Sequence, residues 1–160
     1  GGEDKKSKIE KMRDSRIGSY GVLAILLLTL IKLNALISLV TGKPYEIAIL
    51  SIICAHSLSR FSIIIIPYFS IPASNEGLAR YAGKPANRGI IGSFLITFIL
   101  ILILLPFDQA ILSAFLAILV AGAVGLLANF QIKGYTGDIL GAAQQVSEVT
   151  VLVYLASSSS

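Results

Sequence analysis

Residues 110–130 read AILSAFLAILVAGAVGLLANF, a stretch without one charged side chain. An α-helix needs about 20 apolar residues to cross the hydrocarbon core of a bilayer. Four further long, predominantly apolar stretches occur, and the whole set is Ile17 to Val40, Glu46 to Ile71, Gly89 to Leu105, Ala110 to Phe130 and Ile139 to Ala156. The sequence therefore predicts an all-α, polytopic transmembrane bundle with about five spans.

The composition supports a membrane protein and excludes other classes. Hydrophobic residues make up 55% of the chain and charged residues 14%, with a mean hydropathy of +0.83. Such a chain is too apolar for a soluble domain, and its apolar residues are too clustered for a β-barrel. Its single cysteine, Cys54, lies in an apolar run and offers neither a disulfide framework nor a metal-ligand spacing. We expect the lipid bilayer as a partner and no nucleic acid.

Basic residues predict the orientation. Residues 1–16 are expected to form a basic interfacial segment with a short surface helix, 17–156 the transmembrane domain, and 157–160 a tail. If the N-terminus is cytoplasmic, ten basic residues outside the spans lie inside and only Lys43 lies outside. We therefore expect a multi-pass protein of a prokaryotic cytoplasmic membrane, with its active face cytoplasmic.

A polar motif, Gly134 to Ala142, lies between the last two spans. Its sequence GYTGDILGA places Thr136 and Asp138 among glycines, where a phosphate could approach the backbone closely. Asp138, Gln145 and Glu148 are seven and three residues apart and share a helix face. The favoured interpretation is a ligand site; the alternative is a seam between helices built on small residues.

The second span contains His56 and Arg60, four residues apart on one helix face. Arg60 is near the middle of the span, so we expect it to be buried and paired with Glu148 or with a phosphate. The alternative is a purely structural ion pair.

A third polar element precedes the first span. Asp14 could bind a divalent cation, and Arg13 or Arg16 could hold a phosphate. The alternative is that Asp14 caps the following helix while the arginines anchor the cytoplasmic side.

These three elements together resemble the cobalamin synthase family, the adenosylcobinamide-GDP ribazoletransferases. The residues that carry the resemblance are Met12 to Gly18 with Gly21, Ala55 to Arg60, and Gly134 to Ala142 with Glu148. The resemblance implies a Mg²⁺-dependent transfer that joins adenosylcobinamide-GDP to α-ribazole, or to its 5′-phosphate, and releases GMP. The corrinoid nucleotide and α-ribazole are then its substrates.

The resemblance also implies roles for residues. Catalytic roles go to Asp138, Asp14 and Arg16, with Asp14 and Asp138 as Mg²⁺ ligands. The implied substrate-binding residues are Arg13, Arg60, His56, Thr136, Gly137 and Glu148.

One departure from the family concerns the N-terminus. Members carry an aspartate-rich motif and further helices ahead of the segment that matches Met12 to Arg16, whereas this sequence opens at Gly1. We therefore expect a C-terminal portion of a synthase with little activity alone. A complementing N-terminal segment or a second copy of the chain is a candidate partner.

Two other functions compete with this interpretation. A CDP-alcohol phosphotransferase also sets acids at the cytoplasmic edge of a helical bundle, but the chain lacks that family's aspartate cluster. A non-catalytic transport subunit would use Arg60 and Glu148 as an intramembrane pair. The polar motifs on one face argue against transport.

Overall fold

Five long helices make up the part of the fold that the structure describes. The structure, a computed structural model, describes residues 5, 8–9, 18–74, 79 and 83–158. The helices are α2 (Ser19–Gly42), α3 (Tyr45–Phe69), α5 (Asn87–Leu104), α6 (Phe107–Ile132) and α7 (Gly137–Ser157). All five are long and apolar enough to cross a membrane.

The predicted spans are confirmed, with every helix end within three residues of its expected position. Local chemistry explains the ends. Pro44 and Pro106 directly precede α3 and α6, where the fixed φ of proline suits a helix start. Lys133 ends α6 in the left-handed conformation (φ 52°). Most of the expected surface helix in residues 1–16 lies outside the described residues.

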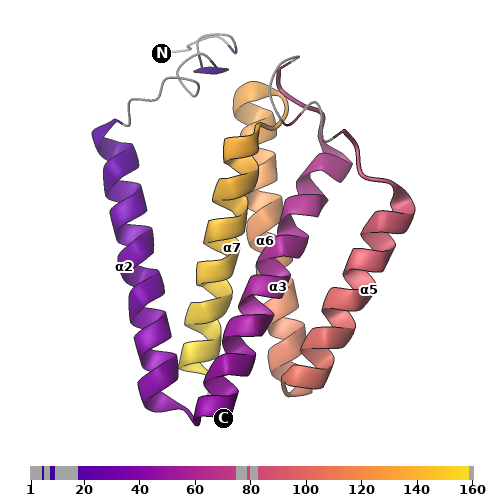
Figure 1. The fold of residues 1–160 in the computed structure, drawn as a ribbon. Helices are drawn as coiled ribbons and strands as arrows, with labels where there is room; N and C mark the ends of the chain where they lie inside the picture. The colour runs from indigo at the N-terminus through magenta and orange to yellow at the C-terminus, as the bar shows by residue number, and fades with distance from the viewer. Residues whose placement is uncertain (1–4, 6–7, 10–17, 75–78, 80–82, 159–160) are drawn as a thin grey trace.

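The helices α3 and α7 form the centre of the bundle, with α6 packed against both. Figure 1 shows α2 and α5 on opposite sides of this centre. Small side chains allow close packing on α6. Its buried face is rich in alanine, with Ala110, Ala114, Ala117, Ala121 and Ala128. The hydroxyl of Ser147 on α7 donates to the carbonyl oxygen of Ala117 at 3.4 Å and ties the two helices together.

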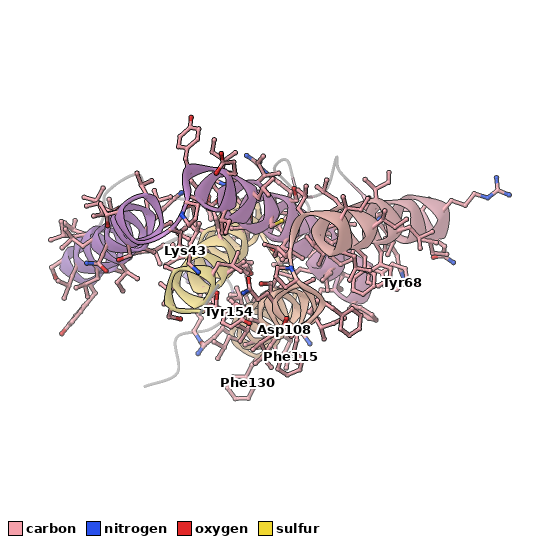
Figure 2. All side chains as sticks on the ribbon, turned by 90° about the horizontal axis from the view of Figure 1, so that it is seen from below. Lys43, Tyr68, Asp108, Phe115, Phe130 and Tyr154 are labelled. Atoms are coloured by element: carbon pink, nitrogen blue, oxygen red, sulfur yellow. The ribbon has the colours of Figure 1, made fainter. Side chains whose placement is uncertain are left out.

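Large apolar side chains cover the outside of the bundle. Phe115 and Phe130 point outward from α6 (Figure 2), and many leucines and isoleucines are exposed as well. On α2 only Ala35 and Leu39, both in its C-terminal half, are buried. Such an exterior suits hydrocarbon, and the chain is a multi-pass membrane protein.

The loop that follows α3 and the loop between α6 and α7 lie at one end of the bundle and are joined by backbone hydrogen bonds. The N–H of Tyr135 donates to the carbonyl oxygen of Ile71 at 3.0 Å, and the N–H of Ala73 donates to that of Tyr135 at 2.9 Å. Gly134 makes this approach possible, because a Cβ there would lie 2.5 Å from the Ile71 oxygen. At the same end, Lys8 donates to the side chain of Gln131 near the end of α6.

We predict that Gly134→Ala destabilises the fold by about 2 kcal/mol, because the added methyl group forces two backbones apart. Thermal unfolding in detergent measures the effect. Gly89→Ala is the control, since a Cβ at Gly89 meets nothing within 4 Å. Equal melting temperatures for the Gly134 variant and the parent would contradict the tight contact.

We predict that Lys84 and Lys133 face the cytoplasm and Glu46 the opposite side, following the basic-residue bias. In a Cys54→Ala background, single cysteines replace each of the three. A membrane-impermeant maleimide should label position 46 in intact cells and the other two only after permeabilisation. Labelling of position 133 in intact cells would reverse the orientation.

Candidate functional site

Asp138 is exposed in the first turn of α7. Thr136 is the N-cap of this helix, and its hydroxyl accepts a hydrogen bond from the N–H of Ile139 at 3.4 Å. The free N–H groups and the dipole of a helix start favour anions. The favoured ligand interpretation of the motif is thus compatible with its geometry, while Thr136 also has a capping role.

The loop before α7 is anchored by Tyr135, whose side chain is 1% exposed. Its hydroxyl donates to the carbonyl oxygen of Ala79 at 3.4 Å. Burial raises the pKa of Tyr135, because the phenolate would lose hydration. The phenol therefore stays a neutral donor, and it fixes the loop that carries Thr136 and Asp138.

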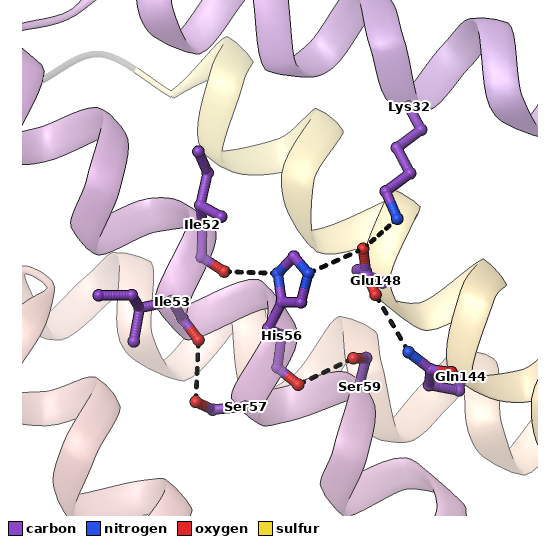
Figure 3. A network of polar contacts seen from close by, with 8 residues as sticks. All are labelled: Lys32, Ile52, Ile53, His56, Ser57, Ser59, Gln144 and Glu148. Atoms are coloured by element: carbon purple, nitrogen blue, oxygen red, sulfur yellow. Dashed lines mark hydrogen bonds and ion pairs between the residues drawn. The ribbon is translucent and has the colours of Figure 1, made fainter.

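A second polar group lies near the middle of three helices. Glu148 of α7 is 1% exposed, and its Oε1 lies 2.5 Å from Nζ of Lys32 on α2. The same oxygen is 3.5 Å from Nε2 of His56 on α3. Gln144 donates from its side chain to Oε2 at 3.1 Å. Figure 3 shows these side chains converging on the carboxylate. We call Lys32, His56, Gln144 and Glu148 the midspan network.

His56 has a defined orientation in this network. Its Nδ1 lies 3.0 Å from the carbonyl oxygen of Ile52, which can only accept, so Nδ1 carries the hydrogen. Its Nε2 then faces Glu148. The imidazole is 47% exposed. The imidazole of His56 therefore contacts the buried Glu148 on one side and is exposed on the surface of α3 on the other.

The expected burial of Arg60 and its pairing with Glu148 are wrong. Arg60 is exposed and forms no ion pair or hydrogen bond with the described part of the chain. It lies one turn beyond His56, about 6 Å along α3. His56 and Lys32 reach Glu148 instead. A substrate-binding role for Arg60 stays a prediction.

Sequence reasoning missed Lys32 and Gln144. The signal for Lys32 was present, since a lone lysine within an apolar span needs an acidic or polar partner. Gln144 could have been found from its spacing of four residues to Glu148, which places both on one face of a helix.

The motif and the midspan network are separate along α7. Glu148 follows Asp138 by ten residues, which corresponds to about 15 Å of helix. Among the described residues no group of three or more His, Cys, Asp or Glu side chains could hold a metal ion. Asp14, Arg13 and Arg16 lie outside the described residues, so the predicted pairing of Asp14 and Asp138 on Mg²⁺ stays a prediction.

Comparison with known proteins identifies relatives over almost the whole chain. Residues 1–156 match the family described as cobalamin-5-phosphate synthase. A protein of Mesorhizobium japonicum named adenosylcobinamide-GDP ribazoletransferase is 38% identical, with 96% of this chain and 58% of the relative covered. Proteins of the same name from Bradyrhizobium diazoefficiens and Shewanella pealeana are 33% and 37% identical, with 98% and 97% of this chain covered.

The chain spans about three fifths of the length of these relatives. The match covers 59% of the Bradyrhizobium diazoefficiens protein and 60% of the Shewanella pealeana protein. No solved structure matches it.

We predict that Lys32 and Glu148 are energetically coupled. Glu148→Gln leaves the Lys32 ammonium without its counter-charge in hydrocarbon and should cost about 2–3 kcal/mol of stability. Lys32→Met should recover about 1 kcal/mol or more of this loss when combined with Glu148→Gln. Thermal unfolding in detergent of the parent, the two single variants and the double variant gives the coupling energy.

Thr29→Val supplies the control for this cycle, since Thr29 is exposed on α2 and, among the described residues, its hydroxyl bonds only to the carbonyl oxygen of Ile25 in its own helix. Its effect should add to that of Glu148→Gln. Additive effects of Lys32→Met and Glu148→Gln would show that the ion pair contributes nothing to the fold.

Proposed function

Because this chain belongs to the cobalamin-5-phosphate synthase family, we propose that it is the larger part of a membrane-bound adenosylcobinamide-GDP ribazoletransferase. The substrates are adenosylcobinamide-GDP and α-ribazole or its 5′-phosphate. A ribose hydroxyl attacks the phosphorus that bears the corrinoid, and a new P–O bond forms. The pyrophosphate bond breaks, GMP leaves with the bridging oxygen, and the hydroxyl proton is lost.

The match over residues 1–156 carries this proposal. The motif at the start of α7 supports it, because exposed Asp138 and the helix N-terminus lie together where a phosphate could bind. Gly137 adds no side chain there, and a Cβ would meet nothing within 4 Å. The backbone of this turn is therefore accessible to a large ligand.

Mg²⁺ is the proposed cofactor, held by Asp138 and Asp14. Mg²⁺ is commonly bound by one or two carboxylates plus substrate phosphates, so the exposed Asp138 carboxylate fits part of this donor set. When bound, the cation would neutralise charge on the pyrophosphate during transfer. Arg13 and Arg16 are proposed to bind the nucleotide phosphates, and Arg60, His56 and Glu148 to contribute on the substrate side.

The activity is proposed for a whole protein of the relatives' length. About two fifths of the relatives' own length lies outside the match, and further acidic ligands are proposed to come from that additional part or from a second copy of the chain. The prediction that this chain alone has little activity follows from the same argument.

We predict that Asp138→Asn in the whole protein lowers the rate of ribazole transfer by about 100-fold or more, because the amide keeps the size of the side chain but loses its charge. GMP release from adenosylcobinamide-GDP and α-ribazole measures the rate.

Asp108→Asn is the matched control, since Asp108 also lies in the first turn of a helix, α6, which begins at the opposite end of the bundle from α7 (Figure 1). This variant should keep the parent rate. An Asp138→Asn enzyme with parental activity would refute the proposed role of the carboxylate.

A further inference from the structure

Gln145 is an unusual side chain for its position. It lies well inside the membrane-spanning helix α7, is exposed, and forms no hydrogen bond with the residues that the structure describes. A carboxamide in hydrocarbon without hydrogen-bond partners is costly. A polar group from outside this chain's described part is therefore needed to pair with it.

Gln145 continues a row of exposed positions on α7. Asp138, Gly141 and Gln145 are spaced three and four residues apart and lie on one side of the helix. Glu148 and the midspan network follow one turn later. We call Asp138, Gly141 and Gln145 the α7 strip. It leads from the end of the helix to the midspan network.

Little of the described part of the chain packs over this strip. A Cβ on Gly141 would meet no atom within 4 Å. The neighbouring helix α2 diverges from α7 toward its own N-terminal end (Figure 1), and only its C-terminal half carries buried residues. A flat ligand would therefore meet little steric obstruction along the strip.

The charges of Lys32 and Glu148, at the end of the strip near the middle of the span, influence which ligand can bind. The Lys32 ammonium is matched by the Glu148 carboxylate, and the two side chains are 28% and 1% exposed. The pair carries no net charge, so a neutral polar group can hydrogen-bond beside it, whereas an anion would have to be matched by Arg60, about one turn beyond His56 on α3. The exposed imidazole of His56 offers a further polar contact.

We propose that the α7 strip binds the carboxamide-bearing macrocycle of the corrinoid substrate, with Gln145 as the recognition residue; this inference rests on the proposed function. A primary carboxamide arm can exchange two hydrogen bonds with the Gln145 side chain, since each group offers a donor and an acceptor. The apolar ring faces hydrocarbon. The anionic pyrophosphate then lies toward Asp138, about 15 Å from Glu148 along the helix.

The experiment uses the whole protein in lipid nanodiscs and two readouts. Cobinamide, which carries the carboxamide arms but no GDP, is titrated and followed by its visible absorbance. Transfer kinetics give KM separately for adenosylcobinamide-GDP and α-ribazole. The variants are Gln145→Leu, which removes the carboxamide, and Gln145→Asn, which retains one.

Gln145→Leu should weaken cobinamide binding about tenfold and raise KM for adenosylcobinamide-GDP by a similar factor, while kcat and KM for α-ribazole change less than about twofold. Gln145→Asn should recover part of the affinity. Asn34→Leu is the matched control, because Asn34 is an exposed carboxamide on α2 outside the strip. It should bind cobinamide like the parent.

Equal cobinamide affinity in the parent and Gln145→Leu, or no binding by the parent, would overturn the inference. So would a fall in the ligand-free melting temperature with both KM values raised, because Gln145 would then pack against another helix. A parent that binds cobinamide through Gln145 but transfers no ribazole would refute the proposed function alone.

Discussion

The buried carboxylate of Glu148 is the constraint on which the arrangement of the helices depends. An acid that is 1% exposed within a membrane bundle must be matched by cations or donors from its neighbours. Lys32 comes from α2 and His56 from α3, so the acid on α7 connects three helices. For α2 this connection matters most, because only Ala35 and Leu39 of that helix are buried.

The two halves of α2, on either side of the Lys32–Glu148 ion pair, differ in how closely they pack against the bundle. Near its C-terminal end, α2 is held by Ala35, Leu39 and the hydrogen bond from the Lys43 ammonium to the carbonyl oxygen of Ser158 at 2.5 Å. Beyond Lys32, toward the N-terminal end, none of the residues described in α2 is buried. The polar face of α7 therefore stays exposed in that half and is covered by packing in the other.

Sequence alone was sufficient for the spans but only partly for the site. The length of each apolar stretch and the positions of the prolines predict where the helices begin and end, and the five helices agree with this prediction. A helix face can also be read from spacing. Which of several basic side chains approaches a buried acid depends on the rotation and height of each helix, and residue spacing within one helix gives neither of these. The sequence therefore predicts Arg60 paired with Glu148 or with a phosphate, whereas Lys32 and His56 are the side chains that lie against Glu148.

Physical chemistry explains why the polar groups of α7 differ along its length. At the helix start, water and unpaired N–H groups can stabilise a charged ligand, so an unmatched carboxylate such as Asp138 is tolerated there. Toward the middle of the span each charge needs a counter-charge, and Glu148 has one. Gln145, which carries no charge, lies between the solvated helix start at Asp138 and the mid-span position of Glu148. A ligand that follows this helix would therefore carry its charge at the helix start, with a cation between an anionic group and Asp138, and would present neutral hydrogen-bonding groups toward the middle of the span.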